Sequence, residues 1–146
     1  MAHQNPTDPT LRALFGSVRT VAVVGASTNP ARPVYGVMDY MLRAGYRVVP
    51  VNPGQAGREI LGQRVYATLA DVPEPVDVVD IFRRQEALAG IVDEALTLRP
   101  LPKAIWMQLD LRDEAAAAKA EAAGLTVVMD RCIKVDHARL PWKTHS

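Results

Sequence analysis

Five apolar runs of strand length are spread along the chain, with polar and helix-like segments between them. Each run is rich in valine, isoleucine and other apolar residues without strict alternation, which is typical of strands covered on both faces of a parallel sheet. The runs are TVAVVG (20–25), YRVVPV (46–51), DVVDIF (77–82), KAIWMQ (103–108) and LTVVMD (125–130). We therefore expect these five segments to form one parallel sheet.

Helical patterns lie between the strands. In the first two, apolar residues recur every three or four positions, and the third is rich in alanine. They are Val34–Leu42, Leu88–Leu96 and 112–123. A short helix from about Thr10 is also expected before the first strand. The alternation predicts an α/β fold: a single Rossmann-like three-layer domain, with a mostly parallel sheet of five to six strands and helices on both faces.

The long segment 52–76 interrupts this alternation and is too broken for a full crossover helix. We expect a loop that includes a short edge strand at Arg64–Tyr66 and a helical turn near Thr68–Val72. Because parallel crossovers are right-handed, the expected strand order is 64–66, 46–51, 20–25, 77–82 and 103–108, with 125–130 as a possible sixth strand.

The expected order reverses beside the first strand. In open α/β sheets, ligands bind outside the carboxyl ends of the strands at such a switch point. We therefore expect the residues just after Val24, Val51 and Ile81 to surround one crevice.

The length of 146 residues fits one domain, which we place at 10–140, between a flexible arm (1–9) and a short tail (141–146). The net charge is +1 with no run of like charge longer than two residues, which argues against nucleic-acid and membrane partners. The single cysteine, Cys132, suits a reducing cytosol, and neither a signal peptide nor a membrane span is visible. We expect a cytoplasmic protein, as a monomer or small homo-oligomer.

The segment VVGASTNPARP joins the first strand to a helix and offers several groups to an anion. Gly25 permits a sharp turn, Ser27 and Thr28 add hydroxyls, and the helix from Pro33 presents unpaired amides. Arg32 adds a planar cation suited to phosphate. The alternative is that Gly25 only ends the strand and Arg32 is a solvated surface charge.

Two common nucleotide-binding motifs are absent from this region. A Walker loop needs a lysine, and none lies nearby. The dinucleotide motif needs three spaced glycines and an acidic residue after the second strand, where this chain has Val51, Asn52 and Pro53. This turn could flank an adenosine without favouring NAD, although an ordinary turn is the simpler interpretation.

The later strand ends supply further polar and aromatic groups. Phe82 and Arg83 could contact a base and a phosphate, whereas Arg84 could merely cover the next helix. Gln108 could bond a ligand amide. For Asp130 and Arg131, the favoured interpretation is a local ion pair that orders the C-terminal segment.

No catalytic constellation stands out. The histidines have no metal-binding spacing with Cys132, and Cys132 has no adjacent histidine, although His137 could approach it in the fold. A binding domain is therefore favoured over an enzyme.

Taken together, VAVVGAS with ARP, GYRVVPVNP, ILGQRVYATLADVP, VDVVDIFRR, AIWMQLD and GLTVVMDRC resemble the small stand-alone CoA-binding proteins. Their domain is similar to the CoA-binding domain of the succinyl-CoA synthetase α subunit, and the resemblance covers about residues 12–140. It implies a Rossmann-like site for coenzyme A. The synthetase subunit carries its phosphohistidine in a later domain that this chain lacks, so the resemblance does not imply ligase activity.

The resemblance also implies roles for individual residues. Phosphate would bind at Gly25, Ala26, Ser27 and Arg32, the adenosine beside Val51, Asn52 and Pro53, and the ligand would also contact Phe82 and Arg83. A lysine of the synthetase after its second strand has no counterpart here except Arg58.

Our leading hypothesis is therefore a protein that binds CoA or an acyl-CoA, with no identified catalytic residue and an unknown partner enzyme. One alternative is an NADP-type oxidoreductase in which Arg58 or Arg83 contacts the 2′-phosphate. Another is a redox or regulatory module in which Cys132 forms a mixed disulfide with the CoA thiol.

Overall fold

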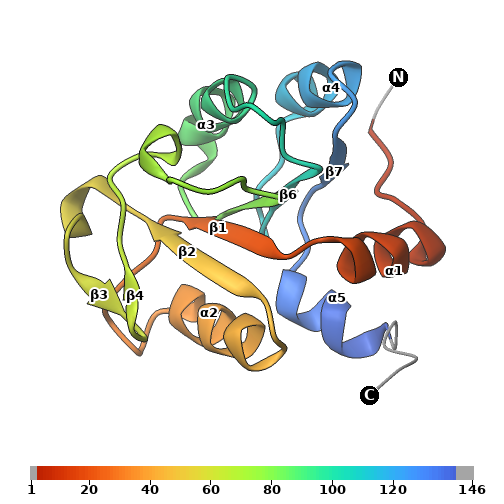
Figure 1. Cartoon of the computed structure of the whole chain (residues 1–146). Coiled ribbons are helices and arrows are strands. Elements are labelled where there is room, and N and C mark those ends of the chain that lie inside the picture. The colour runs from red at the N-terminus through yellow and green to blue at the C-terminus, as the bar shows by residue number, and fades with distance from the viewer. Residues whose placement is uncertain (1–2, 141–146) are drawn as a thin grey trace.

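A single parallel sheet organises the part of the chain that the computed structural model describes, residues 3–140 (Figure 1). Its strands are β1 (Thr20–Val24), β2 (Arg47–Val51), β5 (Val78–Ile81), β6 (Ala104–Met107) and β7 (Thr126–Val128). They lie in the order β2-β1-β5-β6-β7, and every neighbouring pair is parallel. The order reverses beside β1, as the sequence predicts, so the α/β fold class is confirmed.

Helices cover both faces of the sheet (Figure 1). One face carries α1 (Asp8–Ser17), α2 (Pro33–Arg43) and α5 (Ile133–Arg139), and the other carries α3 (Leu88–Ala95) and α4 (Glu114–Ala122). Strand residues alternate between the two cores: Val21 and Val23 pack with the first group of helices, Ala22 and Val24 with the second. Both faces of β1 are therefore buried, which explains its continuous apolar sequence.

The segment between β2 and β5 departs from the expected edge strand. Instead, β3 (Glu59–Ile60) and β4 (Gln63–Arg64) form a small antiparallel hairpin. Only Tyr66 then bridges the main sheet, in parallel with Val51. Short 3-10 helices are η1 (Pro53–Gln55), η2 (Leu69–Asp71) at the predicted helical turn, and η3 (Gln85–Ala87).

Helix α5 is absent from the sequence-based expectations, and its composition explains why. Its buried residues are Ile133, Asp136 and His137, two of which are polar, while Val135 is 58% exposed. An amphipathic pattern of apolar residues is therefore missing. The two buried polar side chains have partners: Asp136 accepts hydrogen bonds from Arg131 and Arg139, and His137 bonds Tyr40.

An aromatic cluster joins the three helices on this face. The His137 Nδ1 lies 2.8 Å from the Tyr40 hydroxyl, and the imidazole packs edge-on against Phe15 and Tyr46. The Tyr46 hydroxyl donates to the Phe15 carbonyl at 2.7 Å. His137 thus packs between α1 and α2 and fixes the position of α5.

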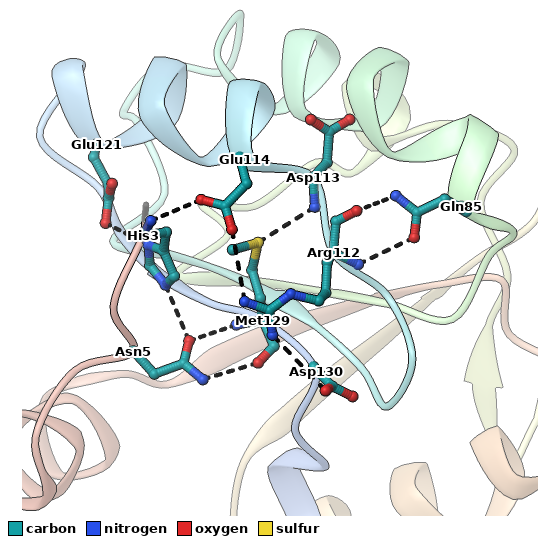
Figure 2. Close-up of polar contacts among 9 residues, drawn as sticks. All are labelled: His3, Asn5, Gln85, Arg112, Asp113, Glu114, Glu121, Met129 and Asp130. Carbon is teal, nitrogen blue, oxygen red and sulfur yellow. Dashed lines mark hydrogen bonds and ion pairs between the residues drawn. The ribbon is translucent and has the colours of Figure 1, made fainter. Parts of the chain in front are cut away.

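Two residues before α1 bond the end of β7 and helix α4 (Figure 2). The Asn5 carboxamide accepts from the Met129 amide at 2.8 Å and donates to the Met129 carbonyl at 2.9 Å. His3 bonds Glu114 through its amide and Glu121 through its ring. The two Asn5 bonds occupy the backbone N–H and C=O of Met129, directly after the edge strand β7, and a sheet edge otherwise leaves such groups unpaired.

No helix in residues 3–140 is long and apolar enough to cross a membrane.

One ionisable side chain lies in the centre of the sheet. Asp80 of β5 is fully buried between Val23 and Trp106, and neither carboxyl oxygen has a hydrogen-bond partner among the described residues. The Trp106 indole N–H donates to the Arg131 carbonyl instead. Burial raises the pKa of Asp80 well above its ordinary value, so the neutral form is favoured in the folded state.

This raised pKa predicts a distinctive effect of Asp80→Asn. A carboxyl group whose pKa is higher in the folded state binds more protons when folded, so its contribution to stability falls as pH rises between the unfolded and folded pKa values. The variant, which has no proton to lose, should gain stability relative to the wild type by up to about 1.4 kcal/mol per pH unit over that window. Urea unfolding at pH 5, 6.5 and 8 measures the difference.

Asp93→Asn on the exposed face of α3 is the control, since it removes only a surface ion pair with Lys119. Its stability difference from the wild type should change little across the same pH values. A pH-independent difference for Asp80→Asn would contradict the assigned shift.

Candidate functional site

The carboxyl ends of the strands surround a cavity of about 620 Å³. Its wall is built from the segments that follow β1, β2, β5 and β6, together with the first turns of α2 and Cys132 beyond β7. Its volume lies within the range of small-molecule binding sites, about 300–1,000 Å³. The cavity therefore occupies the switch-point crevice that the strand order predicts.

Gly25 is required at this position for two independent reasons. Its φ of +93° is a conformation that L-residues with side chains rarely adopt, and a Cβ atom there would lie 2.3 Å from the Phe82 carbonyl oxygen. The Phe82 amide in turn donates to the Val24 carbonyl at 2.8 Å. The loops after β1 and β5 are thus in direct backbone contact.

The amides of the glycine loop are partly committed to holding the loop itself. The amides of Gly25 and Ala26 both donate to the Val51 carbonyl, at 2.9 and 3.4 Å. Beyond them, the amide of Ser27 has no acceptor among residues 3–140, and its hydroxyl accepts from the Asn29 amide. Of the three residues expected to bind phosphate, Ser27 therefore offers the first available backbone donor.

Asn52 fastens this loop to the end of β2. Its side-chain NH2 donates to the Ala26 carbonyl at 2.8 Å, and its Oδ1 accepts from the Gly54 amide at 2.9 Å. Asn52 lines the cavity, whereas Val51 is buried and acts through its carbonyl, and Pro53 lies outside the wall. The absence of an acidic residue here thus reflects a structural role for the amide.

Two arginines reach the cavity wall without a counter-charge. Arg32 precedes α2 and Arg83 follows β5, and neither guanidinium has a hydrogen bond or ion pair with any described residue. Val34 in the first turn of α2 also lines the wall, and its amide has no acceptor among residues 3–140. Positive charge and free N–H groups therefore converge at one end of the cavity, as anion binding requires.

The strand ends bring in residues beyond those expected. Gln55 of η1 lines the wall, and its Oε1 is buried without a partner among the described residues. Leu109, 61% exposed, lies in the wall on the β6 side. Arg58 and Arg84 are not part of the wall. No sequence motif indicated Gln55 or Leu109, because the path of a loop brings each of them to the wall.

The pairing expected between Asp130 and Arg131 is wrong. Arg131 forms its ion pair with Asp136 of α5 at 2.8 Å, which does order the C-terminal segment. Asp130 accepts from the Asp110 amide at 2.7 Å. It also lies 3.8 Å from the Arg112 guanidinium, and Figure 2 shows this ion pair. The side chains of these two adjacent residues point in different directions, so Asp130 holds the loop after β6 instead.

In the described part of the chain, no three histidine, cysteine or acidic side chains lie close enough together to hold a metal ion.

An open parallel sheet with an electropositive crevice at its switch point defines a nucleotide-type ligand-binding domain of the Rossmann-like class. Residues 19–138 match the family model described as the CoA binding domain. The chain therefore belongs to the CoA-binding domain family, as its motifs predict.

The relatives include proteins of about the same length as this chain and a much longer CoA ligase subunit. The uncharacterized protein YneT of Bacillus subtilis is 38% identical over 136 residues, covering 92% of this chain and 97% of that protein. The solved structure of cell-free ID.343 from Thermus thermophilus is 41% identical with a TM-score of 0.87, covering 92% of this chain and 99% of the other. Subunit α of the ADP-forming acetate–CoA ligase I of Pyrococcus furiosus is 32% identical over 88 residues, 58% of this chain and only 19% of that subunit.

The geometry at Gly25 predicts that Gly25→Ala is strongly destabilising. The left-handed conformation costs about 1–2 kcal/mol for a residue with a Cβ. The overlap with the Phe82 carbonyl adds about 1–3 kcal/mol because backbone must move. Denaturant unfolding measures the sum.

Gly45→Ala is the matched control, since Gly45 has a φ of +100° but nothing within 4 Å of its Cβ position. It should show the conformational cost alone. Equal losses for the two variants would contradict the close approach of the β1 and β5 loops.

Proposed function

We propose that this chain binds CoA or an acyl-CoA in the cavity at the carboxyl ends of its strands. The observation that carries the proposal is the pair of arginines, Arg32 and Arg83, that lie in the wall without any carboxylate partner among the described residues. Arg43, Arg47 and Arg139 form ion pairs elsewhere on the surface. Other arginines whose guanidinium groups form no hydrogen bond, ion pair or ring contact with a described residue (Arg12, Arg19, Arg58 and Arg84) lie outside the cavity wall. Unpaired guanidinium groups beside free amides suit a ligand with several phosphate oxygens.

In this proposal the diphosphate lies over the loop after β1. The Ser27 and Val34 amides donate to its oxygens, and Arg32 provides a charge-assisted contact. Gly25 and Ala26 contribute by shaping the loop, since their amides are already bound to Val51.

The adenosine lies toward β2. Asn52 and Gln55 line this side of the cavity, with Val51 and Pro53 supporting the turn from behind. The buried Oε1 of Gln55 is an acceptor without a donor among the described residues, and the adenine amino group supplies one. Phe82 and Arg83 form the opposite wall, between the adenosine and the rest of the ligand.

CoA suits this site better than a nicotinamide dinucleotide. The ribose-binding acid of dinucleotide sites is replaced by Asn52, whose carboxamide is occupied by the Ala26 carbonyl and the Gly54 amide. CoA instead carries a 3′-phosphate, for which Arg32 and Arg83 provide charge. The family model and the CoA named in the Pyrococcus ligase subunit support the same choice.

Titration calorimetry with CoA, dephospho-CoA, NAD and NADP tests the proposal. We expect CoA to bind most tightly, and Arg32→Ala and Arg83→Ala each to weaken binding about tenfold, the low end for charge-assisted contacts because both side chains are solvent-exposed. If one of them contacts the 3′-phosphate, its alanine variant should lose the preference for CoA over dephospho-CoA.

Arg84→Ala is the control, because Arg84 is the exposed neighbour of Arg83 but lies outside the wall. It should bind CoA like the wild type. NADP binding as tight as that of CoA would favour an oxidoreductase, and equal losses in all three variants would indicate only general attraction to a basic surface.

A further inference from the structure

The two sides of the cavity carry different chemical groups. Its unpaired arginines lie on the β1 and β5 side, whereas the wall beyond β6 carries Asp110 and the thiol of Cys132. Strands in a sheet are spaced about 4.8 Å apart, so β1 and β7, three strands apart, are separated by roughly 14 Å. An extended ligand with an anionic end over β1 therefore directs its uncharged end toward β7.

A buried amide at this far end lacks an acceptor. Gln108, at the end of β6, is only 5% exposed and lines the cavity. Its Oε1 accepts from the Ile133 amide at 3.1 Å, and this bond identifies which side-chain atom is the oxygen, because an N–H needs an acceptor. The NH2 group of Gln108 has no partner among residues 3–140. This NH2 group is not among the fully buried unpaired atoms of the described residues, so it opens on the cavity and is available to a ligand carbonyl.

Cys132 lies near the Gln108 side chain. It directly precedes Ile133, whose amide is bonded to Gln108, and its half-buried side chain lines the same cavity. The thiol is free, and it forms no hydrogen bond with any described residue. The far end of the cavity thus presents one amide donor and one thiol to the uncharged end of the ligand.

We propose that the pantetheine arm of CoA extends to this end of the cavity, with a carbonyl on the Gln108 amide, and that Cys132 captures CoA as a mixed disulfide. This inference rests on the CoA site proposed above. The arm of CoA fits the observations because it is uncharged, contains two amide groups and ends in a thiol.

The co-reactant is a CoA disulfide. The Cys132 thiolate attacks one sulfur of the CoA disulfide, the bond between the two CoA sulfurs breaks, and a new bond joins Cys132 Sγ to one CoA. The other CoA leaves as a thiolate and takes up the proton that Cys132 released. Cys132 is oxidised and the departing sulfur is reduced, so no other oxidant is needed. A thiol reductant reverses the reaction.

The proposal gives the site two states. With reduced CoA, binding is reversible, and with CoA disulfide the same contacts guide a covalent capture that caps both thiols against further oxidation. The nucleotide contacts at the β1 end therefore set the selectivity of a reaction at the β7 end.

Intact-mass measurement on the full chain tests the proposal with two disulfides. CoA disulfide carries the nucleotide, whereas pantethine has the same arms and the same disulfide without it. We expect one CoA per chain on Cys132, located by peptide mapping and removed by dithiothreitol. Capture should be about tenfold faster for CoA disulfide than for pantethine, the factor expected from the phosphate contacts.

Three variants separate the possible results. Arg32→Ala should remove the rate advantage of CoA disulfide while leaving the reaction with pantethine unchanged. Cys132→Ser should form no adduct but bind reduced CoA within about twofold of the wild type. Gln108→Glu, which replaces the NH2 donor and keeps an acceptor for Ile133, should slow capture of both disulfides.

Each contrary outcome has a distinct meaning. Tight calorimetric binding of CoA without any adduct overturns the role of Cys132 and leaves the proposed CoA site intact. Equal capture rates for the two disulfides show an ordinary accessible thiol and also overturn the inference. Absence of both binding and rate advantage overturns the CoA site itself.

Discussion

The contact between the loops after β1 and β5 is the constraint on which the site depends. Gly25 brings the first loop against the Phe82 carbonyl, in a space and at a φ value that no other residue fits. Hydrogen bonds from Gly25 to Val51 and from Phe82 to Val24 continue the parallel ladder beyond the ends of the strands. The cavity floor is therefore an extension of the sheet, and its geometry follows from backbone bonds. Side chains such as Arg32 and Arg83 extend from this backbone, and its hydrogen bonds do not involve them.

Away from the cavity, charged side chains also hold the framework of the fold. At the C-terminal helix, Arg139 bonds both Asp8 and Asp136, and the guanidinium lowers the pKa of the Asp8 carboxyl. Arg131 adds a second cation to the buried Asp136. These residues hold α5 against α1, and Cys132, directly before α5, lines the cavity. Paired charges stabilise the fold here, whereas Arg32 and Arg83 line the cavity without a counter-charge among the described residues.

The sequence predicted the features that depend on local patterns. Runs of apolar residues located the five strands, and the switch-point rule brought Gly25, Asn52 and Phe82 to one cavity. No local sequence pattern indicated the contacts between distant segments. Polar groups anchor α5, and Asn5 bonds the backbone of Met129. Nor did any sequence pattern indicate that the Val51 carbonyl holds the glycine loop while its side chain stays in the core.

Several cavity residues serve the fold as well as the proposed ligand. Asn52 ties β2 to the glycine loop, and Gln108 holds the start of α5 while its NH2 faces the cavity. Removing either side chain would leave buried backbone groups unpaired, so a loss of binding would include a loss of structure. Arg32 and Arg83 have no such bonds to the described residues, so their substitution leaves the backbone bonds of the cavity in place, whereas Cys132 also packs against the core. Residues bonded within the protein shape the cavity, and Arg32 and Arg83 are not bonded in this way, so the contribution of these arginines to the proposed binding can be tested without removing a bond that shapes the cavity.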